Sequence, residues 1–261
     1  MSQKTRQEQD SLGKISVSNS NLWGAQTQRS LKNFKIGNDK MPIEIIHALT
    51  VIKMACAKAN QKQKTLIPKI ANAIVNSAKQ VLSGKYDDHF PLSVWQTGSG
   101  TQTNMNVNEV IANLANKKLS GKLGTNSPVH PNDHVNKSQS TNDSFPSAIN
   151  IATSIKIIQE LLPALKNMEK TLRSQSQKWK SIVKIGRTHL QDATPLSLGQ
   201  EFSGYQSQLE DTINRISHAL KEILYLAQGG TAVGTGINTK KNFDKKICRE
   251  ISKITKINFK P

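Results

Sequence analysis

Four polar segments hold most of the side chains in this sequence that could bind or transform a small molecule. They combine hydroxyl, amide and imidazole groups with few bulky apolar residues, and they separate stretches of apolar periodicity. Because binding and catalytic residues gather on loops that a rigid scaffold positions, we expect function in these segments. They are residues 95–104, 130–143, 186–194 and 229–238.

The first segment reads W-Q-T-G-S-G-T-Q-T-N and could hold a carboxylate. Its glycine spacing lets backbone N–H groups face outward beside the hydroxyls of Ser99 and Thr101, with Gly100 between them. A simple turn before a helix would account for the same residues, so both interpretations stay open.

The second segment, H-P-N-D-H-V-N-K-S-Q-S-T-N-D, contains too few apolar side chains to build a core. Amide and hydroxyl groups can fix a dicarboxylate by hydrogen bonds without placing a full charge beside its reacting carbons. Helix capping is the alternative, because Ser, Thr, Asn and Asp are the preferred caps, although capping does not require so many at once. The candidate residues are His130, Asn132, Asp133, Ser140, Thr141 and Asn142.

The third segment, G-R-T-H-L-Q-D, supplies a candidate for proton transfer in His189, next to Thr188. A long helix is predicted to begin near Pro195, and the positive end of its dipole would disfavour an imidazolium. We therefore expect a neutral imidazole that can take up a proton, with a surface or capping histidine as the alternative. Arg187 and Asp192 are expected to pair with each other.

The elements that position these segments are predicted to be helices, because almost no alternating strand pattern is convincing. Shorter helices are expected from Pro42 to Asn60, from Ile67 to Ser83 and from about Val107 to Leu119, with Gly84 and Gly121 closing the last two. The fold class is therefore mainly α.

Two later helices are expected to be much longer, one from near Pro146 to Trp179 and one after Pro195 with an apolar stripe from Leu198 to Ile223. A long helix with a narrow apolar stripe must pack against other long helices of a bundle. The Gly-rich run 229–236 has no strand before it, so we do not interpret it as a phosphate loop.

Composition excludes several function classes. The formal net charge is +18, but the 36 basic residues are mostly lysines scattered along helical faces, which favours a solvated surface over nucleic-acid binding. The same charge would attract a small anionic substrate. No run approaches the about 18 to 20 apolar residues of a membrane span, and no signal peptide is apparent, so we expect a cytoplasmic protein without membrane contact. Cys56 and Cys248 suggest neither a disulfide nor a metal site.

Five blocks, in order, resemble class II fumarase of the fumarase/aspartase superfamily over essentially the whole chain. Aspartase is the nearest rival, but it typically has G-G-A-G-T at Thr97–Thr101 and R-T-Q at Arg187–His189, and both differences favour fumarase. The S-T-N at Ser140–Asn142, where fumarases more often have S-S-N, keeps the hydroxyl. The blocks are Leu22–Ser30, Trp95–Asn106, His130–Asp143, Lys184–Leu196 and Gly229–Thr239.

The resemblance implies reversible hydration of fumarate to (S)-malate in the tricarboxylic acid cycle, with no metal or organic cofactor and no nucleic-acid partner. His189 resembles the catalytic acid/base. The substrate-binding residues would be Ser99, Gly100, Thr101, Ser140, Thr141, Asn142 and Thr188. A second, peripheral dicarboxylate site would comprise His130, Pro131, Asn132 and Asp133.

The family also has a segment G-S-S-x-M-P-x-K-x-N, with a proposed proton-abstracting serine, which this sequence does not contain. We therefore expect a C-terminally truncated form, with an N-terminal helical domain over 1–140 and an incomplete long-helix bundle over 141–261. Family members form homotetramers whose sites combine three subunits. We expect that this chain alone neither assembles nor turns over normally; an aspartate ammonia-lyase or a non-catalytic remnant are the alternatives.

Overall fold

The computed structural model describes residues 4–261, which divide into two compact units. Unit 1 comprises the residues up to Ala152 together with Leu224–Pro261, and unit 2 comprises Thr153–Ile223. The division that the sequence predicts, 1–140 and 141–261, stays a prediction about the assembled protein. Within this chain, residues 141–152 and 224–261 group with the N-terminal part instead.

Unit 1 is built mainly of helices around one apolar core. Its helices are α1 (Ala25–Asn33), α2 (Ile43–Lys62), α3 (Pro68–Val81), α4 (Thr101–Ser120), the first part of α5 (Thr141–Lys156) and α8 (Phe243–Thr255), with a short 3₁₀ turn η1 (Asp87–His89) and a π-helical turn η2 (Pro131–Val135). α2 packs against α3 and α8, and α4 against α1 and α3. The core side chains come from all the longer helices and include Leu49, Ile52, Ile74, Ile111, Ile151 and Ile247.

The helix predictions are confirmed, with shifts at their ends. Pro42 is the N-cap residue of α2 and so lies just before the helix. Gly84 and Gly121 have positive φ, as expected after helix ends. The largest shift is in α4, which begins at Thr101 and not near Val107. Its first six residues are T-Q-T-N-M-N, which have no apolar stripe, so periodicity does not reveal the start of this helix. The helix α1 is not predicted from the sequence either.

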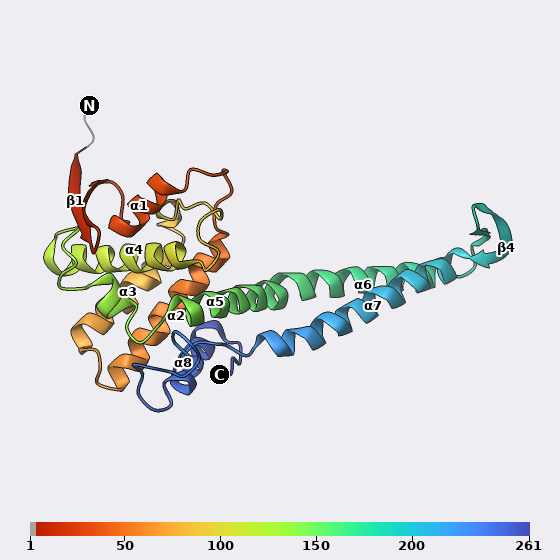
Figure 1. Ribbon diagram of the computed structural model, residues 1–261. Helices are drawn as coiled ribbons and strands as arrows, with labels where there is room; N and C mark the ends of the chain where they lie inside the picture. The colour runs from red at the N-terminus through yellow and green to blue at the C-terminus, as the bar shows by residue number, and fades with distance from the viewer. Residues whose placement is uncertain (1–3) are drawn as a thin grey trace. The chain divides into compact units, whose positions relative to one another are not determined.

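Unit 2 is a pair of antiparallel helices closed by a β-hairpin (Figure 1). After the end of α5 and the π-helical turn η3 (Ile157–Leu161), α6 (Leu162–Lys178) packs against α7 (Leu198–Ile223), and β3 (Val183–Thr188) pairs with β4 (Gln191–Ser197) between them. No residue of α6 is buried, and only Gly199 is buried in α7. The apolar stripes that predicted a bundle are therefore only half-covered within this chain.

Both β-hairpins correct the expectation of almost no strands. β1 (Thr5–Asp10) pairs with β2 (Gly13–Ser18), and in β4 Pro195 pairs with Ile185. Proline inside a strand is unusual, and the sequence pattern at Pro195 predicts a helix start, whereas α7 begins at Leu198.

One continuous helical run, Thr141–Lys178, reaches a mean hydropathy of 1.2 over 18 residues, with 22% of that window buried. By length and composition alone it could cross a membrane, a property that it shares with core helices of soluble proteins. The run carries the ion pair Lys156–Glu160 at 2.6 Å.

Candidate functional site

The first predicted loop turns sharply at Gly100 into α4. Gly100 has φ +73°, and a Cβ placed there would lie 2.4 Å from the ring of Phe145 in α5. Only glycine meets both conditions without strain. The turn leaves Ser99 and Thr101 exposed, with their hydroxyl oxygens 2.9 Å apart. The two candidate hydroxyls therefore lie together at the start of a helix.

The second predicted loop ends at Ser140, which caps α5. The Ser140 hydroxyl accepts a hydrogen bond from the Asn142 backbone N–H at 3.2 Å, and the Asp143 carboxylate accepts one from the Ser140 N–H at 3.0 Å. This reciprocal pattern is a capping box. The capping alternative thus describes Ser140 correctly, and its hydroxyl proton is still free to be donated.

Asp143 also ties this loop to the Gly-rich segment that follows α7 in the sequence. Its Oδ2 accepts hydrogen bonds from the N–H groups of Gly229 and Thr231, at 3.0 and 2.9 Å, and from Gln228 Nε2 at 3.2 Å. Burial raises the pKa of Asp143, while the hydrogen bonds from the backbone N–H groups of Ser140, Gly229 and Thr231 and the charge of Lys53 act in the opposite direction. The Gly-rich run 229–236, which we do not interpret as a phosphate loop, therefore supports the predicted binding loop through its hydrogen bonds to Asp143.

The first and second predicted loops lie close together, because the helices that follow them, α4 and α5, are in contact at their N-terminal ends. Asn104, in the second turn of α4, donates from Nδ2 to the hydroxyl oxygen of Thr141 at 3.1 Å, and Phe145 lies against Gly100. The N-terminal ends of α4 and α5 are therefore neighbours, and both carry hydroxyl groups. Helix N-terminal ends present partial positive charge and free N–H groups, so two of them side by side favour an anion.

The predicted second dicarboxylate site forms the turn η2. His130 Nδ1 accepts hydrogen bonds from the N–H groups of Asn132 and Asp133, at 3.2 and 3.1 Å. An acceptor Nδ1 leaves the proton of the neutral ring on Nε2. His130, Pro131 and Asn132 line a cavity of about 680 Å³ that Thr101 also lines, whereas the Asp133 side chain is 73% exposed.

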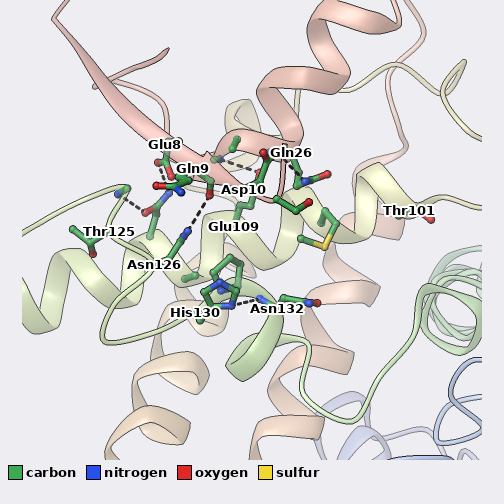
Figure 2. Close-up of a pocket in the computed structure, with 18 residues that line it drawn as sticks. Glu8, Gln9, Asp10, Gln26, Thr101, Glu109, Thr125, Asn126, His130 and Asn132 are labelled. Carbon is green, nitrogen blue, oxygen red and sulfur yellow. Dashed lines mark hydrogen bonds between the residues drawn. The ribbon is translucent and has the colours of Figure 1, made fainter. Parts of the chain in front are cut away.

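Figure 2 shows this cavity beneath β1, with His130 and Asn132 close together and Thr101 at one edge of the group. Glu109 of α4 forms part of its wall and accepts four hydrogen bonds from the start of α1, including the Thr27 hydroxyl at 2.6 Å. Burial raises the pKa of Glu109 to about 7, although the hydrogen bonds lower it. Glu109 therefore caps α1 and shapes the cavity.

The third predicted loop lies in unit 2, whereas the other predicted loops belong to unit 1. His189 and Leu190 form the two-residue turn between β3 and β4, with φ of 49° and 61°. Positive φ at both positions is typical of a type I′ hairpin turn. His189 is thus not at a helix N-terminus, because α7 starts only at Leu198. The expected effect of a helix dipole on His189 is therefore wrong, since residues 183–197 pair as strands.

The neighbours of His189 are exposed. Thr188 ends β3, and Arg187 pairs with Asp192 across the hairpin at 2.9 Å, as expected. Leu190 is 86% exposed. A bulky exposed residue with positive φ is uncommon, and such strain often marks a functional turn.

Lys53 and Asp143 support the site but were not proposed as functional residues. A lysine inside the apolar run V-I-K-M-A-C-A was the available signal for Lys53, and the spacing Ser140-x-x-Asp143 was the signal for the capping box. Among residues 4–261, no group of three or more His, Cys, Asp or Glu side chains is arranged to hold a metal ion.

Comparison with known proteins confirms the resemblance. A family described as lyase matches residues 13–261. The chain is 56% identical over 255 residues to fumarate hydratase class II 2 of Bradyrhizobium diazoefficiens, covering 98% of this chain and 54% of that protein. Fumarate hydratase class II of Rickettsia bellii is also 56% identical, with coverages of 98% and 55%.

Solved structures agree with this fold. The crystal structure of recombinant class II fumarase from Schistosoma mansoni superposes with a TM-score of 0.96 at 42% identity, covering 99% of this chain and 57% of that one. The chain spans about half the length of the curated relatives it matches.

Proposed function

We propose that this chain, which belongs to the lyase family and has class II fumarases as its relatives, carries the dicarboxylate-binding loops of a fumarate hydratase. The activity would be the reversible hydration of fumarate to (S)-malate. The observation that carries the proposal is the contact between Asn104 and Thr141, because it places the N-terminal ends of α4 and α5 together.

These loops suit the charge changes of the reaction. When the oxygen of water adds to one carbon of the double bond, the electron pair of that bond moves towards the carboxylate on the other carbon. That other carbon then takes up a proton. Hydrogen-bond donors held in place before the reaction stabilise that build-up of charge. Ser99, Thr101, Ser140, Thr141 and Asn142 would supply the donors.

The reaction also needs a group that accepts and donates a proton, and His189 is our candidate for this role. It lies in the exposed hairpin turn of unit 2, next to Thr188 at the end of β3, which would bind the substrate. We propose that the full-length enzyme of this family is a cytoplasmic homotetramer in which His189 of one copy acts at the loops of another, and that this chain alone does not assemble normally. The half-covered stripes of α6 and α7 would form the contacts between copies.

His130, Pro131, Asn132 and Asp133 would form a second dicarboxylate site on the turn η2. The Nε2–H of His130 is the donor that this site would offer, since Nδ1 is already an acceptor. The cavity that Thr101 shares with His130 and Asn132 would connect the two sites.

Calorimetric titration with fumarate tests the proposal. Thr141→Val keeps the shape of the side chain but removes its hydroxyl, and it should weaken binding about tenfold, the effect of one hydrogen bond to a charged group. Ser203→Ala, which removes an exposed hydroxyl on α7, is the control and should bind like the wild type. Equal affinity for the wild type and Thr141→Val would contradict the assignment of the site.

A further inference from the structure

Lys53 is a buried cation directly behind the predicted binding loop. It lies in the middle of α2, its side chain is fully buried, and its ammonium donates to the amide oxygens of Asn136 at 2.8 Å and Gln139 at 2.9 Å. Replacing a buried charge by an apolar side chain of similar volume often stabilises a protein. A lysine at this position therefore calls for an explanation other than packing.

The ammonium fixes the orientation of a chain of amide groups. It has only donors, so Asn136 must turn its oxygen towards Lys53. The same oxygen accepts a hydrogen bond from Asn104 Nδ2 at 3.3 Å, and this requires Asn104 to present its amino group. The amino group then donates to the Thr141 hydroxyl oxygen at 3.1 Å. Each step is set by the one before it.

The end of this chain is the hydroxyl proton of Thr141. Because the Thr141 oxygen accepts from Asn104, its own proton is directed elsewhere, and it can be donated to a carboxylate. If the side-chain amide of Asn104 were flipped, its oxygen would accept a hydrogen bond from the Thr141 hydroxyl, and that proton could not be donated to the substrate. Asn104 is 1% exposed, so solvent cannot replace these partners.

We propose that Lys53 is a positioning residue, whose ammonium sets the direction of the Thr141 hydroxyl through Asn136 and Asn104 so that Thr141 donates to the substrate carboxylate. The proposal rests on the proposed function for the identity of the substrate. The chain of orientations itself depends only on contacts within unit 1.

The surroundings of Lys53 make its protonation state adjustable. Burial lowers the pKa of Lys53 to about 8, while the charge of Asp143 on α5 raises it. Burial raises the pKa of the Cys56 thiol on α2, so this neighbour stays uncharged while Lys53 titrates. Cys248 of α8 lies near enough to influence the Cys56 thiol. Loss of the Lys53 proton removes one donor from the cluster and weakens the constraint on Asn136.

Nuclear magnetic resonance of the wild-type chain tests the orientation chain without any substitution. The side-chain NH₂ signals of Asn104 should shift as pH rises from about 6 to about 10, with the same midpoint as the Lys53 ε-carbon signal. The control is Asn116 in the same helix, whose NH₂ donates to the Val129 carbonyl at 2.8 Å and should not follow that titration. Asn104 signals that stay constant while Lys53 titrates would overturn the proposal.

A double-substitution cycle on fumarate affinity tests the link to the substrate. Lys53→Met and Thr141→Val should each weaken binding about tenfold, and the double variant should be no weaker than either, because both remove the same donated proton. Lys62→Met changes an exposed lysine on the same helix and should bind like the wild type. Losses that multiply to about a hundredfold would show independent roles and overturn the proposal.

The two tests separate the possible failures. If the wild-type chain does not bind fumarate, the proposed function fails, and the Asn104 titration still decides whether Lys53 sets the amide orientation. If Lys53→Met does not fold, the same titration of the wild type decides the question.

Discussion

Asp143 joins two segments that are far apart in sequence, and replacing it with asparagine should destabilise unit 1 by about 2 to 3 kcal/mol. Its Oδ2 accepts three hydrogen bonds from Gln228, Gly229 and Thr231. Its Oδ1 accepts two, from the Ser140 N–H at 3.0 Å and from the Ser144 hydroxyl at 3.3 Å. Asparagine has a single oxygen, which would stay with the three donors. Its NH₂ group would then face the Ser140 N–H.

The magnitude follows from these contacts. An N–H left buried without a partner costs about 1 to 3 kcal/mol, and the three remaining hydrogen bonds each lose the strengthening that a charged acceptor gives. The loss is partly offset, because the neutral amide avoids the cost of burying a charge, the cost that raises the pKa of Asp143. The net loss is therefore about 2 to 3 kcal/mol, smaller than the sum of the separate losses.

Urea unfolding followed by tryptophan fluorescence measures this loss. A Trp179→Phe background leaves Trp23 and Trp95, both in unit 1, as the reporters. Asp211→Asn changes an exposed aspartate on α7 in the same way and should leave the unit 1 transition unchanged. A loss below about 0.5 kcal/mol for Asp143→Asn would refute the idea that this carboxylate ties the two segments together.

Three further predictions concern the same elements. Glu109 keeps its proton in the folded state up to a pH of about 7 but loses it near 4.5 when unfolded, so its contribution to stability is complete below pH 4.5 and is lost by pH 7. Glu109→Gln should remove this decline of the unfolding free energy when urea unfolding is measured across that pH window. An unchanged dependence of the unfolding free energy on pH would contradict the raised pKa. Gly100→Ala should lower the stability of unit 1 by about 2 to 4 kcal/mol, because of the positive φ and the clash with Phe145. Adding Phe145→Leu should recover part of that stability in thermal denaturation. A fully stable Gly100→Ala would argue against the turn geometry. Leu190→Gly should relieve the strained hairpin turn and raise the stability of unit 2 by about 0.5 kcal/mol in Trp179 fluorescence, whereas destabilisation would show that Leu190 makes contacts not expected from its exposure.

Apolar periodicity revealed most of the fold, and it failed where apolar residues do not set the structure. The α2, α3 and α7 helices have clear apolar faces and appeared close to their predicted bounds. The strands of unit 2 carry no such alternation, and a proline inside β4 imitated a helix start. Hairpin pairing depends on partners elsewhere in the chain, which a local pattern cannot show.

The candidate site could be located from its polar loops, but its internal connections could not. The family resemblance implied that the hydroxyls of Ser99, Thr101 and Thr141 bind one substrate, and in the structure the Asn104 contact brings the starts of the two helices together. The positions of Lys53 and Asp143 behind these hydroxyls depend on packing between α2, α4 and α5. Contacts between residues 83 or more positions apart leave no periodic signal in a sequence.

Backbone amide mapping of fumarate binding tests the central claim most directly. Addition of fumarate to the isotopically labelled chain should shift the amide signals of Ser99, Gly100, Thr101 and of residues 140–142, and uncharged fumaramide at the same concentration should not. These shifts would place a dicarboxylate at the joined N-terminal ends of α4 and α5. Saturating fumarate that leaves both loops unshifted, or that shifts only other parts of the chain, would contradict the account.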